Sequence, residues 1–213
     1  PHLRQVAVLG ADGDIADHTG SRCLPEVAVT RHDNAVALGN MLSSRTVTEN
    51  MIEMWRSTDA PLTDRLIASL AAGQAGGGDV RGQQGAAVLV VERAHVDSDA
   101  GVVCDLRVDD HADPINELRR LRRVHTESAT MSRATYPPSL GRAPGGDDSA
   151  GREETIKALI DAGGAVRDEA RLWLAVSRLI DGNEAAARDA LGHDPTLITV
   201  ARRWAEVIEQ PKP

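Results

Sequence analysis

The chain has 213 residues, enough for one domain and a small appendage. Its 41% hydrophobic and 26% charged residues match ordinary globular usage, which argues against disorder along the whole length. A net charge of -8 would repel the phosphate backbone of a nucleic acid. The chain has one Tyr, three Trp and no Phe, so few aromatic side chains are available to stack on bases. We therefore expect no nucleic-acid partner.

The apolar runs are short, and the two cysteines stand far apart. No run approaches the ~18 residues of a membrane-spanning helix, and no targeting segment is visible, so we expect a cytoplasmic protein without a membrane partner. Cys23 and Cys104 lack CxxC or Cys/His spacing. Two small buried residues are the first interpretation, and a disulfide or a reactive thiol stays open.

Turn residues between short apolar runs predict two hairpins near the start of the chain. Residues 6–9 and 15–18 flank an Asp-Gly turn, and residues 27–30 and 35–38 flank the turn at 32–34. In the residues that follow, the apolar side chains recur at helical spacing. One helix is expected around residues 47–55, with Thr46 or Thr48 as its N-cap, and a second helix around residues 62–70.

Two further strands and a helix follow the glycine-rich stretch. Residues 86–92 are apolar on both faces, which is typical of an interior strand covered on both sides. Residues 102–108 are the next strand, and Pro114 starts a helix after Asp113, a natural N-cap. Hairpins followed by paired helices predict an α+β sandwich of sheets and helices.

The end of the chain is expected to be helical. Residues 133–152 are rich in Pro, Gly, Ser and Asp and read as a linker, so we divide the chain into 1–132, 133–152 and 153–213. The last segment resembles part of a tetratricopeptide-like hairpin. Because one and a half units are too few for a solenoid, this piece should pack on the main domain or on a partner, and we expect a homo-oligomer.

Chemistry is most concentrated at the glycine-rich turn. Asp79 and Arg81 flank Val80, so both side chains can reach the same side. Arg81 could clamp a carboxylate or carbonyl, and Asp79 could orient a nucleophile or an amine. Alternatively, Asp79 caps the amides of the turn while Arg81 pairs with an acid such as Asp105.

A second polar group is the acidic corner after the last strand. Arg107 stands between two acids, which favours structural ion pairing, whereas oxygen-rich clusters with a histidine also suit divalent cations. Both interpretations stay open. The residues of this corner are Asp105, Asp109, Asp110, His111 and Asp113.

Two other positions carry polar side chains at strand ends. His18, Thr19 and Ser21 could contribute to a nucleophilic triad on paper, but Ser and Thr beside Gly usually make turns. Asn40 lies where a strand gives way to a helix. Its amide could donate to an oxyanion, or it could serve as a turn or a helix cap.

Four motifs in this order resemble a prokaryotic family known as domain of unknown function 1028, which is similar to N-terminal-nucleophile (Ntn) hydrolases. The resemblance runs from about Leu3 to about His125. It implies an αββα sandwich of the Ntn-hydrolase type, incomplete at its N-terminus, with a small all-α C-terminal appendage. The motifs are His18-Thr-Gly20, Gly39-Asn-Met-Leu42, Gly77-Gly-Asp-Val-Arg-Gly-Gln83 and Asp105-Leu-Arg-Val-Asp-Asp-His111.

Two departures from the family pattern bear on activity. Members that resemble this chain usually carry Ser where it has Gly85, and they begin with strands upstream of the segment that matches Leu3. In Ntn hydrolases the nucleophile is the first residue of such a strand, and its α-amine acts as the base. Pro1 has no nucleophilic side chain. We therefore expect this chain to lack the catalytic residue and to be inactive by itself.

The leading hypothesis is amide-bond hydrolysis, or descent from it, on a small amide or peptide-like substrate and with no cofactor. The alternatives are a non-enzymatic binding or assembly module that uses the helical tail, and a divalent-metal protein centred on Asp109, Asp110 and His111. For the hydrolase, the residues expected to position substrate or oxyanion are Asn40, Asp79 and Arg81, with His18, Thr19, Gln83, Asp105 and Arg107 in contact with substrate or in support.

Overall fold

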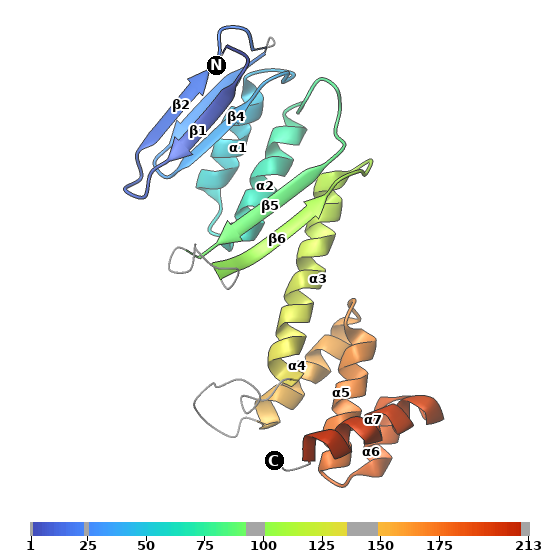
Figure 1. The fold of residues 1–213 in the computed structure, drawn as a ribbon. Helices are drawn as coiled ribbons and strands as arrows, with labels where there is room; N and C mark the ends of the chain where they lie inside the picture. Colours follow the sequence, from blue (N-terminus) through green and yellow to red (C-terminus); the bar gives the residue numbers. More distant parts are fainter. Residues whose placement is uncertain (1, 24–25, 93–100, 136–148, 210–213) are drawn as a thin grey trace. The chain divides into compact units, whose positions relative to one another are not determined.

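The computed structural model describes residues 2–23, 26–92, 101–135 and 149–209 (Figure 1). These residues form six strands and seven helices, so the fold is mixed α/β. The chain divides into two compact units, Pro1–Arg122 and Arg123–Pro213. The αββα sandwich in its finer detail stays a prediction.

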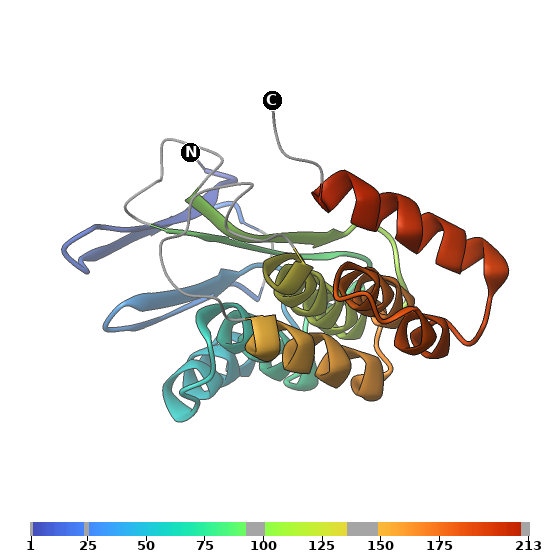
Figure 2. The same cartoon turned by 90° about the horizontal axis from the view of Figure 1, so that it is seen from below.

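Both N-terminal hairpins are confirmed. β1 (Gln5–Leu9) pairs antiparallel with β2 (Ile15–Thr19), and β3 (Ala28–His32) pairs with β4 (Ala35–Gly39). Gly13 takes a φ of 94° in the first turn, which glycine adopts without strain. Figure 2 shows the β1–β2 hairpin on the side of β3–β4 that faces away from the helices of this unit.

Two helices cover the other side of the second hairpin. α1 (Thr46–Ser57) packs on β3 and β4, and α2 (Leu62–Ala75) packs on α1 and on the next strand. The predicted cap of α1 is wrong, because Arg45 holds the N-cap position and no side chain caps the helix. Thr48 is instead buried, with its hydroxyl 2.8 Å from Thr30 Oγ1, since it belongs to the face of α1 that packs on β3.

The third hairpin and the first part of the third helix complete the first unit. β5 (Ala86–Val91) pairs with β6 (Val102–Val108), and α3 (Pro114–Thr135) follows them. Buried side chains of α2, both strands and α3 form one cluster that contains Ile67, Val88, Val90, Cys104, Val108 and Leu118.

The expectation that residues 86–92 are covered on both faces is wrong for the part of the chain that the structure describes. Leu89 is 61% exposed and Val91 44% exposed, whereas Val88 and Val90 are buried. The alternation follows from the pleat, because the helices cover only one face of β5. Of the cysteines, Cys104 is buried and Cys23 half-buried, and neither forms a disulfide.

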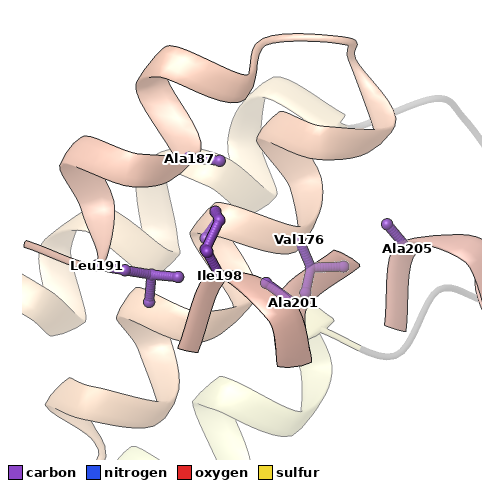
Figure 3. Packing of buried hydrophobic residues seen from close by; sticks show 7 residues of the cluster. Val176, Ala187, Leu191, Ile198, Ala201 and Ala205 are labelled. Atoms are coloured by element: carbon purple, nitrogen blue, oxygen red, sulfur yellow. The ribbon is translucent and has the colours of Figure 1, made fainter. Parts of the chain in front are cut away.

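The second unit is helical, as predicted. α4 (Ser149–Ala162), α5 (Arg167–Ile180), α6 (Glu184–Ala190) and α7 (Pro195–Glu209) follow one another in the chain. The Asn183 side chain caps α6 by accepting from Ala186 N at 3.1 Å, and Asp194 accepts from Thr196 N at 2.8 Å at the start of α7. The cluster in Figure 3 joins α5, α6 and α7 through Val176, Ala187, Leu191, Ile198, Ala201 and Ala205.

The predicted linker meets helix at both ends. α3 continues to Thr135 and α4 begins at Ser149, and residues 136–148 lie outside the described part of the chain. The division at residues 132 and 152 therefore stays a prediction. No helix among the described residues is long and apolar enough to span a bilayer.

Leu118 tests whether α3 and the third hairpin share one core. Leu118→Ala should lower the free energy of unfolding by about 2–5 kcal/mol, because this side chain is 0% exposed and its removal leaves a cavity. Urea unfolding measures the loss. The matched control is Leu89→Ala, which should change stability by less than about 0.5 kcal/mol, since Leu89 is 61% exposed. Equal effects of the two substitutions would contradict a core centred on Leu118.

Candidate functional site

An acid and a guanidinium form a fork directly after the glycines that follow α2. Arg81 donates from Nε to Asp79 Oδ1 at 2.9 Å and from Nη2 to Oδ2 at 2.6 Å. The backbone N–H of Arg81 also donates to Asp79 Oδ1, at 2.8 Å. A bidentate pair with a third bond fixes both side chains in one plane. Asp79 thus accepts a backbone N–H of the turn, as the alternative predicted, whereas the predicted pairing of Arg81 with Asp105 is wrong.

Backbone pairing with the segment after β4 holds this turn in place. Ser43 N donates to Gly78 O and Val80 N donates to Met41 O, both at 2.9 Å, so that Leu42 and Asp79 form an antiparallel bridge. Gly77 has a φ of 113°, and a Cβ at this position would collide with the Ser43 hydroxyl. Glycine is therefore required for the close approach of the two segments.

The fork keeps Asp79 ionised. The Arg81 side chain, followed by the Arg81 backbone N–H, lowers the pKa of Asp79 to about 2. The same hydrogen bonds raise the pKa of the Arg81 guanidinium. At neutral pH both side chains are therefore charged, and the pair has no net charge.

A cavity of about 460 Å³ opens beside the fork. Polar side chains from the turn line one part of it, and apolar side chains from α2 and the start of α3 line another. It brings together three predicted site residues, Asp79, Arg81 and Gln83. The remaining lining residues are Leu70, Gln74, Gly82, Gln84, Gly85, Ala86, Ala87, Pro114 and Ile115.

Gly85 is confined by the backbone at the end of β6. A Cβ at Gly85 would lie 2.9 Å from the carbonyl oxygen of Val108 and 3.3 Å from that of Asp109. A serine at this position would require the two strand ends to separate, because backbone atoms cannot give way as a side-chain tip can. The glycine therefore lets the wall of the cavity close tightly.

Asn40 belongs to a different group, which the sequence reasoning missed. Its amide donates to Gln5 Oε1 at 3.4 Å, and Gln5 Nε2 in turn donates to Thr19 Oγ1 and to Ala28 O, both at 3.3 Å. Gln5 alternates with Ala7 and Leu9 along β1, and this polar residue in an otherwise apolar strand was the available signal. Asn40 and Thr19 therefore meet through Gln5, outside the cavity of Asp79.

His18 and Thr19 lie on opposite faces of β2 and do not form one group. Successive residues of β2 point to opposite faces, so that His18 is exposed opposite Val6 while Thr19 is half-buried. Ser21 Oγ lies 3.4 Å from His2 Nδ1. The described contacts of these residues assemble no Ser-His-Asp arrangement, and the turn interpretation of this segment accounts for them.

The acidic corner is a set of local ion pairs and caps. Arg107 donates from Nε to Asp109 Oδ1 at 2.5 Å, and this bond raises the pKa of Arg107. Asp105 lies on the same exposed face of β6 and adds a weaker attraction. Asp113 accepts from Asn116 N at 3.3 Å, which confirms its predicted role as the cap of α3.

The geometry does not favour a metal at this corner. His111 Nδ1 accepts from the backbone N–H of Asp113 at 2.9 Å, so this nitrogen is already engaged. Among the described residues, no group of three or more His, Cys, Asp or Glu side chains is placed to hold a metal ion. Structural ion pairing and capping therefore explain the corner.

Comparison with known proteins places the first part of the chain in one family. A family model described as "Family of unknown function (DUF1028)" matches residues 1–118. No curated protein matches the chain. The crystal structure of a Silicibacter pomeroyi protein of this family is similar, with 29% identity over 57% of this chain and 52% of that chain, and a TM-score of 0.49. The chain spans about half the length of that protein.

The titration of Asp79 tests the fork. Arg81→Ala should raise the pKa of Asp79 from about 2 toward the ordinary value of about 3.9, because only the backbone bond remains. Since the native pKa is lowered, the stabilising effect of the pair is complete above about pH 4 and is lost as the pH falls through the native pKa. Carbon-13 NMR of the carboxyl carbons follows the titration. Arg107→Ala is the control and should leave Asp79 unchanged; a wild-type Asp79 that titrates near 3.9 would contradict the fork.

Proposed function

Because this chain belongs to the family called domain of unknown function 1028, for which no activity is assigned, we propose a function from its cavity. The cavity binds a small amide or peptide-like substrate and positions it for amide-bond hydrolysis of the Ntn-hydrolase type. Asp79 and Arg81 orient the substrate, and Gln83 contacts it. The observation that carries the proposal is the Asp79–Arg81 fork at the wall of the cavity.

The polar part of the cavity suits a neutral amide. The two charges of the fork cancel, so that a charged ligand would find no unpaired opposite charge there. Arg81 uses Nε and Nη2 for Asp79, which leaves its Nη1 for a carbonyl oxygen. The side chains of Gln74, Gln83 and Gln84 line the same space, and each amide can both donate and accept, as a peptide bond does.

The apolar part of the cavity supplies binding without specificity for charge. Leu70 from α2 and Ile115 from α3 face the cavity together with Pro114 and Ala87. A short aliphatic or small side chain on the substrate would be removed from water here, which contributes roughly 25 cal/mol per Å² of apolar surface buried. Pockets with an apolar lining and a few fixed polar groups are the usual form of ligand sites.

The lining residues bind and orient, and they do not attack. None of them is a Ser, Thr, Cys, Lys or His, the usual nucleophiles or bases. Asp79 is a weak base at neutral pH, because the fork lowers its pKa to about 2. The nucleophile of the proposed reaction therefore comes from outside these lining residues.

The remaining predicted residues have supporting roles in the proposal. Asn40 directly precedes Met41, whose carbonyl oxygen accepts from Val80 N beside the fork. Gln5 joins Asn40 to Thr19, so that this group can hold the segment on which Asp79 rests. Arg107 and Asp105 lie on the exposed face of β6, and His18 lies on the exposed face of β2, all three outside the lining of the cavity.

Binding of N-acetylalanine amide tests the proposal, with hydrolysis of the same compound measured in parallel. Arg81→Lys and Asp79→Asn should each weaken binding at least about tenfold, since each breaks the bidentate geometry that orients the guanidinium toward the substrate. The melting temperature should stay within a few degrees. NMR shift changes at Gln83 report binding. Asp109→Asn, whose carboxylate pairs with Arg107 and lies outside the cavity, is the control. Equal binding by all variants would reject the site.

A specific observation favours a second candidate function, assembly through the helical unit. Along α7, five apolar side chains at helical spacing are 36–62% exposed: Leu197, Val200, Trp204, Val207 and Ile208. The Trp204 ring lies 5.6 Å from that of Trp173, so Trp204 is anchored to α5. Several exposed apolar side chains on one helix are typical of a protein–protein contact.

Light scattering on a sizing column tests assembly. Val207→Glu should shift the protein toward the monomer, because the contact would bury a charge. Arg203→Glu, another exposed position of the same helix, is the matched control and should leave the mass unchanged. A wild-type chain that is monomeric at its highest soluble concentration would rule out self-assembly.

A further inference from the structure

A second cavity lies in the helical unit, where the two apolar clusters of this unit approach each other. It has a volume of about 230 Å³. One cluster joins the end of α3 to α4 and α5, and the other joins α5 to α6 and α7. Trp173 packs against both clusters and lines the cavity. The lining residues all belong to this unit, so the cavity shares no residue with the one beside Asp79.

Much of the lining is apolar. Ile156 of α4 and Val176 of α5 are 5% and 2% exposed, so each is fixed in position by the cluster to which it belongs. Ala134 and Ser177 also line the cavity, and their short side chains leave its space unfilled. Sites for drug-sized ligands have about 300–1,000 Å³, so this cavity suits a smaller molecule that has an apolar part.

The lining also contains two opposite charges. Arg152 lies near the start of α4 and Asp181 directly follows α5, and both line the cavity. In the part of the chain that the structure describes, neither side chain takes part in a hydrogen bond or an ion pair. The carbonyl oxygens at the end of α5 add partial negative charge beside Asp181. The cavity therefore offers one cation and one anion with which a ligand can pair.

The third charged residue of the lining is already compensated. Oε1 of Glu153 accepts from Lys157 Nζ and from Arg178 Nη2, both at 2.5 Å. The bond to Arg178 joins the start of α4 to the end of α5. This bond therefore holds Arg152 and Asp181 at the same end of the helix pair.

We propose that this cavity binds a free α-amino acid with an apolar side chain, such as leucine. The carboxylate of the ligand pairs with the Arg152 guanidinium, which can hold both of its oxygens, and the ammonium pairs with Asp181. The apolar side chain packs against Trp173 and Ile156, where it is removed from water. A ligand with a single charge would leave either Arg152 or Asp181 without a partner, so the cavity selects a zwitterion. The small volume favours one amino acid over a longer peptide.

Titration with leucine, followed by NMR of the tryptophan indole N–H groups, tests the proposal. The signal of Trp173 should shift with a Kd of about 1 mM or below. The signal of Trp55, which lies on α1 in the first unit, is the internal control and should stay in place. No shift of the Trp173 signal, or an equal shift of both signals, would overturn the proposal.

Three relatives of leucine test which parts of the ligand are recognised. Leucinamide lacks the carboxylate and N-acetylleucine lacks the ammonium, so each should bind at least about tenfold more weakly than leucine. Glycine carries both charges without an apolar side chain, and its binding should also be weaker. Equal affinity for all four compounds would refute recognition of an apolar zwitterion.

Substitutions at the two charges assign each to one end of the ligand. Arg152→Gln and Asp181→Asn should each weaken leucine binding at least about tenfold, and Arg152→Gln should leave the binding of leucinamide unchanged. Asp161→Asn at the end of α4 and Arg167→Gln at the start of α5, both exposed and outside the lining, are the matched controls and should bind leucine as wild type does. Undiminished binding in either site variant, or equal loss in the controls, would contradict the proposed site.

Discussion

The first unit depends on the antiparallel bridge between Leu42 and Asp79. This bridge joins the end of the second hairpin to the turn that leads into the third, although the two segments stand far apart in the sequence. It forms because Gly77 allows the backbone to approach Ser43 closely. The position of the fork, the start of β5 and the wall of the cavity all follow from this contact.

The bridge and the fork together place an ion pair without net charge at the wall of the cavity. Arg81 satisfies the carboxylate of Asp79 with three hydrogen bonds, so the pair adds polarity to the cavity without adding net charge. The proposed ligand is neutral and hydrogen-bonding for this reason. The fork also removes Asp79 from acid–base chemistry near neutral pH, because a strongly stabilised carboxylate is a poor proton acceptor.

The sequence by itself determined the local structure of this protein. The strands, helices, Asp-Gly turn and Asp113 cap follow from periodicity and short-range hydrogen bonding, and four short motifs identified the family. Tertiary structure decided which polar residues meet. Arg81 pairs with Asp79 and not with Asp105, and Gln5 connects Thr19 to Asn40 by hydrogen bonds. Thr48 is buried against Thr30 instead of capping α1. The reason is physical: a pattern shows which face of an element is apolar, whereas packing between elements decides what lies opposite that face.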